Sequence, residues 1–301
     1  MRLLLLGGNG QVGRELRRSL PPLGEVVVAT RDGLDADEAA DFDAPDALAT
    51  LVARLAPDVV VNAAAYTAVD RAETDADAAL RANAEAPAAL ARACARSDAL
   101  LLHYSTDYVF DGNKPGAWRE DDAAKPQSVY GSSKWQGEQA IRASGCRHFI
   151  LRTSWVAGVY GQNFLKTMLR LAASRDSLSV VADQFGAPTP ASLLADVAAN
   201  LVQRARSTAD QPYGTYHVAA QGCTSWHEYA SYVIDLAREA GWPLQLAAAP
   251  QAIPSSAYPQ KACRPANSQL DCSKLMQTFD LQLPHWQQAV KQIFDTLDNL
   301  K

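Results

Sequence analysis

Long apolar runs are missing from this chain of 301 residues. The run at the N-terminus, Leu3–Leu6, is followed by two glycines, and no segment approaches the roughly 20 apolar residues that a membrane-spanning helix needs. The same run is too short for the apolar core of a signal peptide. We therefore expect no membrane association and a location in the cytoplasm.

Cysteine and histidine are scarce, with five residues of each. The cysteine count is odd and no pair has the CxxC spacing, which argues against a disulfide framework or a structural zinc site. The histidines form no HExxH pattern, so a catalytic zinc is also unsupported. We expect reduced thiols and no metal ligands.

Charge is modest and slightly negative. Lys and Arg number 28 against 33 Asp and Glu, so the net charge is −5 with neutral histidines. Broad binding to nucleic acid or to a membrane surface needs clustered positive charge, and this balance argues against it, although a local basic pocket can still hold an anionic ligand. Hydrophobic residues make up 48% of the chain, which is enough for a large core.

The first 155 residues alternate between two kinds of segment. Near-continuous apolar runs predict buried parallel strands, and the Ala-rich segments between them predict helices. The expected strands are Leu3–Leu6, Val26–Ala29, Val59–Val61, Leu100–Tyr104 and Phe149–Leu151. The expected helices are Val12–Leu20, Pro45–Leu55, Asp75–Ala95 and Ser132–Ala143. This alternation predicts an α/β fold with a Rossmann-type, doubly wound parallel sheet.

The pattern changes after about residue 155, where glycines and prolines interrupt it. We predict a dinucleotide-binding domain over residues 1–155, completed by part of 186–220, and a smaller C-terminal substrate-binding lobe over residues 156–301. The helices expected there are Phe164–Ser174, Ser192–Arg204, Trp226–Ala240 and Trp286–Leu297. A strand is expected at Gly214–Val218, and Pro243–Pro259 is expected to be irregular.

A glycine loop follows the first expected strand and opens a helix. Its spacing is Gly7-x-x-Gly10-x-x-Gly13. Glycines allow a tight turn and let backbone N–H groups approach a pyrophosphate, to which the helix N-terminus adds a favourable dipole. Because the loop has the required strand–turn–helix context, it predicts binding of a dinucleotide.

The choice of cofactor depends on the end of the second strand, where Arg31 and Asp32 stand together. An acidic residue there suits the ribose hydroxyls of NAD, whereas an arginine suits the 2′-phosphate of NADP. We expect NADPH, with NADH as the alternative.

Tyr130 and Lys134 are four residues apart at the start of an expected helix, so they share one face of it. An ammonium group beside a phenol favours the phenolate, which predicts that the pKa of Tyr130 falls toward neutrality. Thr106 ends the fourth strand, in the crevice where doubly wound folds bind ligands, and could polarise the same substrate oxygen.

At this point the sequence resembles the extended short-chain dehydrogenase/reductase superfamily, and within it the dTDP-4-dehydrorhamnose reductase family. The likeness covers almost the whole chain. It is carried by Gly7–Gly13 (GGNGQVG), Pro57–Ala65 (PDVVVNAAA), His103–Gly112 (HYSTDYVFDG), Tyr130–Lys134, Leu151–Val156 (LRTSWV), Asn163–Leu169 (NFLKTML), Asp183–Thr189 (DQFGAPT) and Arg264–Leu270 (RPANSQL).

The resemblance implies reduction of the 4-keto group of dTDP-4-dehydro-L-rhamnose to dTDP-L-rhamnose, the last step of dTDP-rhamnose biosynthesis. Tyr130, Lys134 and Thr106 would be the catalytic residues. The cofactor would lie against Gly7, Gly10, Gln11, Val12, Gly13, Arg31, Asp41, Phe42, Ala63, Ala64, Tyr66, Tyr130 and Lys134. The sugar would contact Ser105, Thr106, Asp107, Tyr108 and Trp155.

Three other readings stay open or are disfavoured. Related dehydratases carry Asp-Glu after the catalytic Thr, whereas this chain has Asp107-Tyr108, so dehydration is disfavoured. A nucleotide-sugar epimerase and a non-catalytic regulatory subunit of the same fold are the alternatives.

Some family members form dimers around a magnesium ion. Glu15 matches one expected ligand but Ser192 stands where an acid is expected, so we predict a homodimer without that metal.

Overall fold

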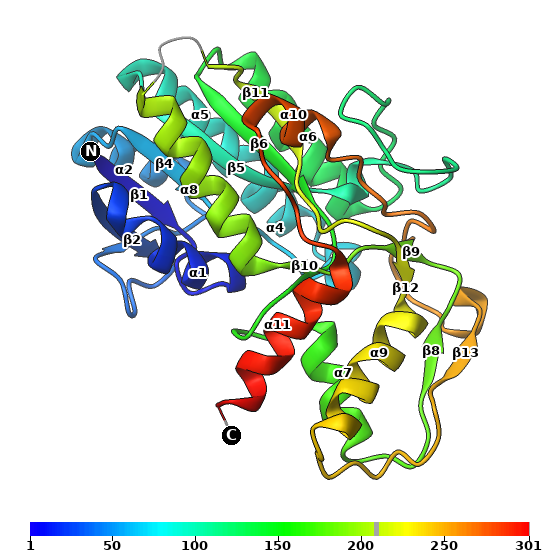
Figure 1. The fold of residues 1–301 in the computed structure, drawn as a ribbon. Helices are drawn as coiled ribbons and strands as arrows, with labels where there is room; N and C mark the ends of the chain where they lie inside the picture. Colours follow the sequence, from blue (N-terminus) through cyan, green and yellow to red (C-terminus); the bar gives the residue numbers. More distant parts are fainter. Residues whose placement is uncertain (208–210, 301) are drawn as a thin grey trace.

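A computed structural model describes residues 1–207 and 211–300 of the chain. Its centre is a seven-stranded sheet in the order β11-β6-β5-β4-β1-β2-β3 (Figure 1), in which neighbouring strands are parallel. The strands are β1 (Arg2–Leu6), β2 (Glu25–Thr30), β3 (Glu38–Ala39), β4 (Val59–Asn62), β5 (Leu100–Thr106), β6 (His148–Thr153) and β11 (Gly214–His217).

Helices cover both faces of this sheet, which explains why its central strands are apolar on both sides. Successive strand residues point to opposite faces. Leu3 and Leu5 of β1 therefore pack in one cluster with α1 and α8, whereas Leu4 and Leu6 pack in another with α2 and α5. The helices of this region are α1 (Gln11–Ser19), α2 (Pro45–Leu55), α3 (Val69–Ala72), α4 (Ala76–Leu80), α5 (Ala86–Ser97), α6 (Val129–Ala143), α8 (Ala191–Ser207) and α10 (Ser273–Phe279).

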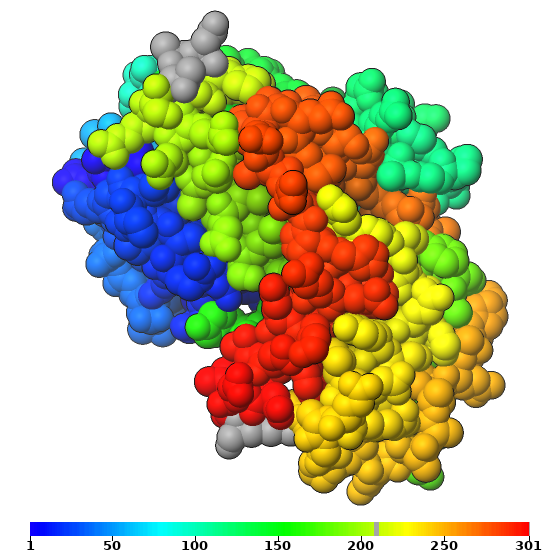
Figure 2. Space-filling model, in the orientation of Figure 1, coloured from blue at the N-terminus to red at the C-terminus, as the bar shows by residue number. Residues whose placement is uncertain are grey.

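The rest of the C-terminal half forms a smaller helical layer with its own apolar cluster. Its helices are α7 (Phe164–Ala172), α9 (Trp226–Glu239) and α11 (Trp286–Asp298). Three short strand pairs edge it: β7 (Val156–Ala157) with β10 (Thr189–Pro190), β9 (Phe185–Gly186) with β12 (Thr224–Ser225), and β8 (Ser179–Val181) with β13 (Gln251–Ile253). In the space-filling view α8 lies against the N-terminal part of the chain, while α11 and α9 form much of the visible face of the smaller layer (Figure 2).

Two sequence predictions need correction. The expected continuous helix Asp75–Ala95 is divided into α4, a π-helical turn η2 (Arg81–Glu85) and α5. Pro87 lacks the backbone N–H that would bond to the carbonyl of Asn83, so regular α-helical bonding is interrupted there. The segment Pro243–Pro259 is also less irregular than expected, because it contains β13, which pairs with β8.

Candidate active site

Three loops meet at the carboxyl edge of the sheet, after β1, β4 and β5. These strands are neighbours in the sheet, in the order β5-β4-β1, so the segments that follow them are adjacent. The first is the glycine loop, the second begins at Ala63, and the third is a 3-10 turn η3 (Asp107–Val109). This is the edge at which doubly wound folds bind their ligands.

The glycine loop is closed by the N–H of Gly10, which donates to the carbonyl of Gly7 at 3.0 Å. A Cβ on Gly13 would lie 2.0 Å from that same carbonyl oxygen, so only glycine allows α1 to start this close to the loop. No side chain caps the N-terminus of α1, and its first turn carries no acidic residue. The free N–H groups and the helix dipole suit a pyrophosphate, so this loop fits a dinucleotide.

Other residues expected near the cofactor differ in their placement. Ala63, Ala64 and Tyr66 follow β4, and the backbone of Tyr66 is held by the buried amide of Asn83, with bonds of 2.9 and 3.0 Å. Asp41 is exposed, while the neighbouring Phe42 is buried in the apolar core.

Arg31 is exposed in the turn directly after β2. A second arginine, which we did not single out from the sequence, lies closer to the loop. The Nε of Arg17 donates to the carbonyl of Gly8 at 2.8 Å, and its guanidinium pairs with Asp35 at 3.3 Å.

The N-terminus of α6 brings Tyr130 to the third loop. The hydroxyl of Ser128 caps the helix by accepting the N–H of Gly131 at 3.1 Å. A Cβ on Gly131 would lie 2.2 Å from the carbonyl oxygen of Tyr108, so glycine permits the helix to contact η3 directly. As a result the hydroxyl of Tyr130 lies beside that of Thr106, which itself donates to Oδ1 of Asp107 at 3.1 Å. The rings of Tyr130 and Tyr108 also meet edge to face at 5.4 Å.

The expectation that Lys134 lowers the pKa of Tyr130 is wrong. Burial raises the pKa of Tyr130 to about 12, against the opposing effect of the hydrogen bond from Thr106. The amine of Lys134 is held instead by the carbonyl oxygen of Tyr104 at 2.6 Å and lies 3.3 Å from Nε2 of His103. Tyr130 is therefore a neutral phenol near pH 7, which is the form that can donate a proton.

Lys134 is itself unusual because it is only 2% exposed. Burial lowers the pKa of its amine to about 8, although the negative charge of Glu138 acts in the opposite direction. This lysine can therefore exchange its proton close to neutral pH.

A buried ion pair ties α6 to the strands beneath it. The carboxylate of Glu138 accepts two bonds from the guanidinium of Arg152 on β6, at 2.9 and 2.7 Å. It also accepts the hydroxyl of Ser105 at 2.6 Å. Ser105 therefore points away from Thr106, its neighbour on β5, and the structure does not bring it together with the other residues expected at the sugar.

Polar atoms without partners gather at the ends of β5 and β6. Within the part of the chain that the structure describes, Asp107 Oδ2, Thr153 Oγ1 and Ser154 Oγ are buried and have no hydrogen-bond partner. Thr153 is the register partner of Thr106, so these atoms lie beside the Tyr130–Thr106 pair. Burial also raises the pKa of Asp107 to about 6. Unpaired buried polar atoms are unfavourable, so this cluster fits a ligand that carries hydroxyl groups.

Trp155 lies just beyond β6 in a left-handed backbone conformation, with φ of +49°. Its ring stacks on Trp226 of the smaller layer at 3.6 Å. A Cβ on Gly186 would lie 2.7 Å from the Trp155 ring, so the ring is packed on a second side. Trp155 therefore joins the two parts of the chain.

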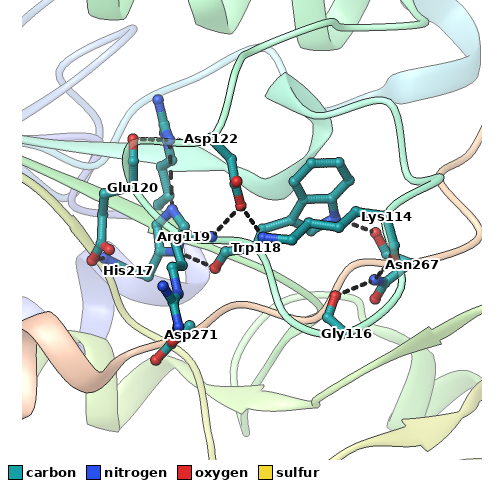
Figure 3. A network of polar contacts seen from close by, with 10 residues as sticks. Lys114, Gly116, Trp118, Arg119, Glu120, Asp122, His217, Asn267 and Asp271 are labelled. Carbon is teal, nitrogen blue, oxygen red and sulfur yellow. Dashed lines mark hydrogen bonds and ion pairs between the residues drawn. The ribbon is translucent and has the colours of Figure 1, made fainter.

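The segment between η3 and α6 is anchored by the C-terminal half (Figure 3). The side chain of Asn267 donates to the carbonyls of Lys114 and Gly116 at 2.7 Å each. The N–H of His217 donates to Glu120 at 2.9 Å. These contacts fix the segment that leads into α6, so the RPANSQL stretch supports the site from outside the sheet.

The chain is similar to known proteins over almost its whole length. The family described as the RmlD substrate binding domain matches residues 1–299. The chain is 46% identical over 297 residues to the dTDP-4-dehydrorhamnose reductase of Escherichia coli (strain K12), covering 99% of this chain and 98% of that protein.

The chain belongs to the RmlD substrate-binding-domain family.

Solved structures of this family share the fold. A dTDP-4-dehydrorhamnose reductase ortholog from Clostridium acetobutylicum ATCC 824 has a TM-score of 0.89 and 34% identity, covering 99% of both chains. The dTDP-4-dehydrorhamnose reductase of Bacillus anthracis str. Ames, in complex with NADP, has a TM-score of 0.86 and 32% identity, covering 98% and 99%. The predicted Rossmann-type sheet is confirmed.

Residues 1–207 and 211–300 contain neither a membrane-spanning helix nor a cluster of metal-binding side chains. No helix in these ranges is long and apolar enough to cross a bilayer. No group of three or more His, Cys, Asp or Glu side chains there could hold a metal ion.

Sequence reasoning did not single out several residues of this site. His103 and Glu138 reach it only through strand and helix packing. Arg264 pairs with Asp70 of α3 at 2.9 Å, and its charge acts on Tyr108. The signal for Arg264 was present in the RPANSQL stretch, but no spacing rule links that stretch to η3. Trp226 lies far from Trp155 in the sequence and carried no signal at all.

Proposed function

We propose that this RmlD-family chain uses NADPH, with NADH as the alternative, to reduce the 4-keto group of dTDP-4-dehydro-L-rhamnose to dTDP-L-rhamnose, the last step of dTDP-rhamnose biosynthesis. One observation carries the proposal. The neighbouring hydroxyls of Tyr130 and Thr106 lie at the carboxyl edge of the sheet that also holds an uncapped, glycine-led helix N-terminus.

In this proposal Tyr130 is the proton donor. A bound nicotinamide cofactor would supply a hydride for the keto carbon. The O–H bond of Tyr130 breaks as its proton moves to the former keto oxygen, so the sugar gains one hydride and one proton. The hydroxyl of Thr106, which donates to Oδ1 of Asp107 at 3.1 Å in this structure, would turn its hydrogen to that oxygen and stabilise the negative charge as it develops.

The remaining predicted residues are assigned to binding. Lys134 would hold the nicotinamide ribose. The free N–H groups of Gln11, Val12 and Gly13 would hold the pyrophosphate, and Gly10 would shape the loop against it through its bond to Gly7. Arg31 would hold the 2′-phosphate. Asp107, Tyr108 and Trp155 would contact the sugar, and the unpaired Oδ2 of Asp107 is suited to accept one of its hydroxyls.

The proposal also assigns cofactor binding and substrate binding to different parts of the chain. Residues 1–155, with β11 and α8 completing the layers around the sheet, would hold the cofactor, and most of 156–301 would form the substrate lobe. A homodimer is proposed without bridging magnesium, because Glu15 pairs with Arg18, which in turn pairs with Asp196. A cytoplasmic location agrees with the five free cysteines, which suit a reducing compartment.

The deciding experiment follows NADPH absorbance when the purified protein meets dTDP-4-dehydro-L-rhamnose. We expect rapid loss and dTDP-L-rhamnose as product. Tyr130→Phe should lower kcat/KM by about 10²- to 10⁴-fold with unchanged cofactor affinity, because only the proton donor is removed. The exposed Tyr258→Phe is the matched control and should be fully active.

Other results would point elsewhere. Isomerisation of a nucleotide sugar by tightly bound NAD, without NADPH consumption, would indicate the epimerase alternative. Cofactor binding without turnover of any keto-sugar, together with capture of a partner enzyme, would indicate the regulatory subunit. Full activity in Tyr130→Phe would refute the role given to Tyr130.

A further inference from the structure

The amine of Lys134 ends a buried chain of polar contacts that begins at the loop after β4. The N–H of Ala64 donates to Oδ1 of Asn62 at 3.1 Å. Nδ2 of Asn62 lies 3.0 Å from Nδ1 of His103, and Nε2 of His103 lies 3.3 Å from Nζ of Lys134. Asn62, His103 and Lys134 are 1%, 0% and 2% exposed, so water does not compete for these contacts.

The direction of each donor follows from the first contact. A backbone N–H can only donate, so Asn62 must present its oxygen to Ala64 and its NH₂ group to His103. The NH₂ group is a donor only, which makes Nδ1 of His103 an acceptor. Burial and the neighbouring Lys134 lower the pKa of His103 well below its ordinary value, so the ring is neutral and its one proton lies on Nε2.

This tautomer presents an N–H to Lys134. An ammonium group has three donors and no acceptor, so against Nε2–H it makes an unfavourable donor–donor contact. A neutral amine has a lone pair and accepts the bond. The carbonyl of Tyr104, at 2.6 Å, takes one amine hydrogen in either form and does not discriminate between them.

We propose that His103 is a positioning residue that favours the neutral amine of Lys134, and that Asn62 sets this preference by fixing the ring tautomer. The inference rests on the proposed function, in which Tyr130 gives up a proton in each turnover. The neutral amine is the form left when the ammonium of Lys134 releases its proton, and only that form accepts Nε2–H.

The other charged or titratable groups around Lys134 do not account for a preference for its neutral amine. Glu138 on α6 favours the ammonium, but its carboxylate is shared with Arg152 of β6. Tyr130 lies one turn earlier on α6, and the carboxylate of Asp107 in η3 accepts the hydroxyl of Thr106 at 3.1 Å. The buried residues of η2 and α5, which pack against α6, are uncharged, and the pKa of the Cys94 thiol among them is raised to about 12 by burial.

The tautomer is tested directly by nuclear magnetic resonance on protein labelled with ¹⁵N-histidine. Two-bond ¹H–¹⁵N correlations should show an unprotonated Nδ1 and a protonated Nε2 for the ring whose signals vanish in His103→Gln. A protonated Nδ1 overturns the inference. The readout does not involve turnover, so a protein that fails to reduce the sugar and still shows this tautomer refutes the proposed function alone.

The effect on Lys134 is tested by following its ¹³Cε signal against pH in three proteins. In Asn62→Asp the carboxylate still accepts from Ala64 but requires a proton on Nδ1, so Nε2 becomes an acceptor for the ammonium. We expect the Lys134 midpoint to rise by about one pH unit or more.

The uncharged variant His103→Gln separates donor polarity from added charge. Its amide can turn its oxygen toward the ammonium, so it should raise the Lys134 midpoint in the same direction. A rise in Asn62→Asp alone would show that only the new charge acts, and no rise in either would show no effect of His103; both results overturn the inference. The wild-type tautomer decides the question if either variant fails to fold.

Discussion

Removal of the buried guanidinium in Arg152→Met should destabilise the protein by leaving the carboxylate of Glu138 inside the fold with too few partners. The two side chains are 2% and 0% exposed and share bonds of 2.9 and 2.7 Å. Breaking a buried pair by deleting one partner costs about 3–5 kcal/mol. Ser105 and the half-buried Arg142 still contact the carboxylate, so we expect the lower end, about 3 kcal/mol.

This loss can be converted to a change in melting temperature. With an unfolding entropy of about 2.1 cal/mol/K per residue over 301 residues, it lowers the Tm by roughly 5 °C. The change also depends on pH. The pKa of Glu138 is lowered in the folded protein by Arg152, against the opposing effect of burial, so this stabilisation is present above the unfolded pKa and is lost as the pH falls. The difference between wild type and variant should therefore shrink as the pH falls below 4.5, the ordinary pKa of a glutamate.

Calorimetry at several pH values measures both effects. Lys291→Met, which removes one partner of an exposed pair on α11, is the control and should leave the Tm unchanged. The double variant Glu138→Met with Arg152→Met should be more stable than Arg152→Met, because no charge is then buried without a partner. A Tm for Arg152→Met equal to that of wild type, or a double variant less stable than the single one, would refute this reasoning.

Three further predictions concern the site. Arg31→Ala should weaken NADPH by about tenfold and leave NADH unchanged in fluorescence titrations, because only NADPH carries the 2′-phosphate; equal effects would remove Arg31 from that role. Asp107→Asn should raise the Tm at about pH 8 but not below about pH 4. Burial raises the pKa of Asp107 from 3.8 to about 6, so the penalty for its charged form grows between these values and is absent once the carboxyl is protonated in both the folded and the unfolded protein. The variant should also raise the KM for the sugar, and an unchanged Tm would contradict the argument. Gly131→Ala should lower kcat by about a hundredfold with unchanged cofactor affinity. The new Cβ would lie 2.2 Å from the carbonyl oxygen of Tyr108 and would displace the start of α6. A normal kcat would show that this close contact is not needed.

Local pattern was sufficient for the layered architecture and for part of the site. The central strands are buried on both faces, so they can be recognised from their apolar runs without tertiary information. The expected strands fall within β1, β2, β4, β5 and β6. The glycine loop was legible because its spacing and its strand–turn–helix context are both local. Short elements such as β8 and β13 were not, because each owes its pairing to a distant partner rather than to its own sequence.

The four-residue spacing places Tyr130 and Lys134 on one helix face, but it does not say which groups the amine of Lys134 contacts. The sequence predicted that Lys134 would lower the pKa of Tyr130, whereas the folded chain turns the amine toward Tyr104 and His103 and raises that pKa by burial. Desolvation and donor direction depend on neighbours more than 25 residues away in the sequence. The sequence by itself therefore determined the fold class and the chemical groups available, and only the tertiary structure decided their protonation and their partners.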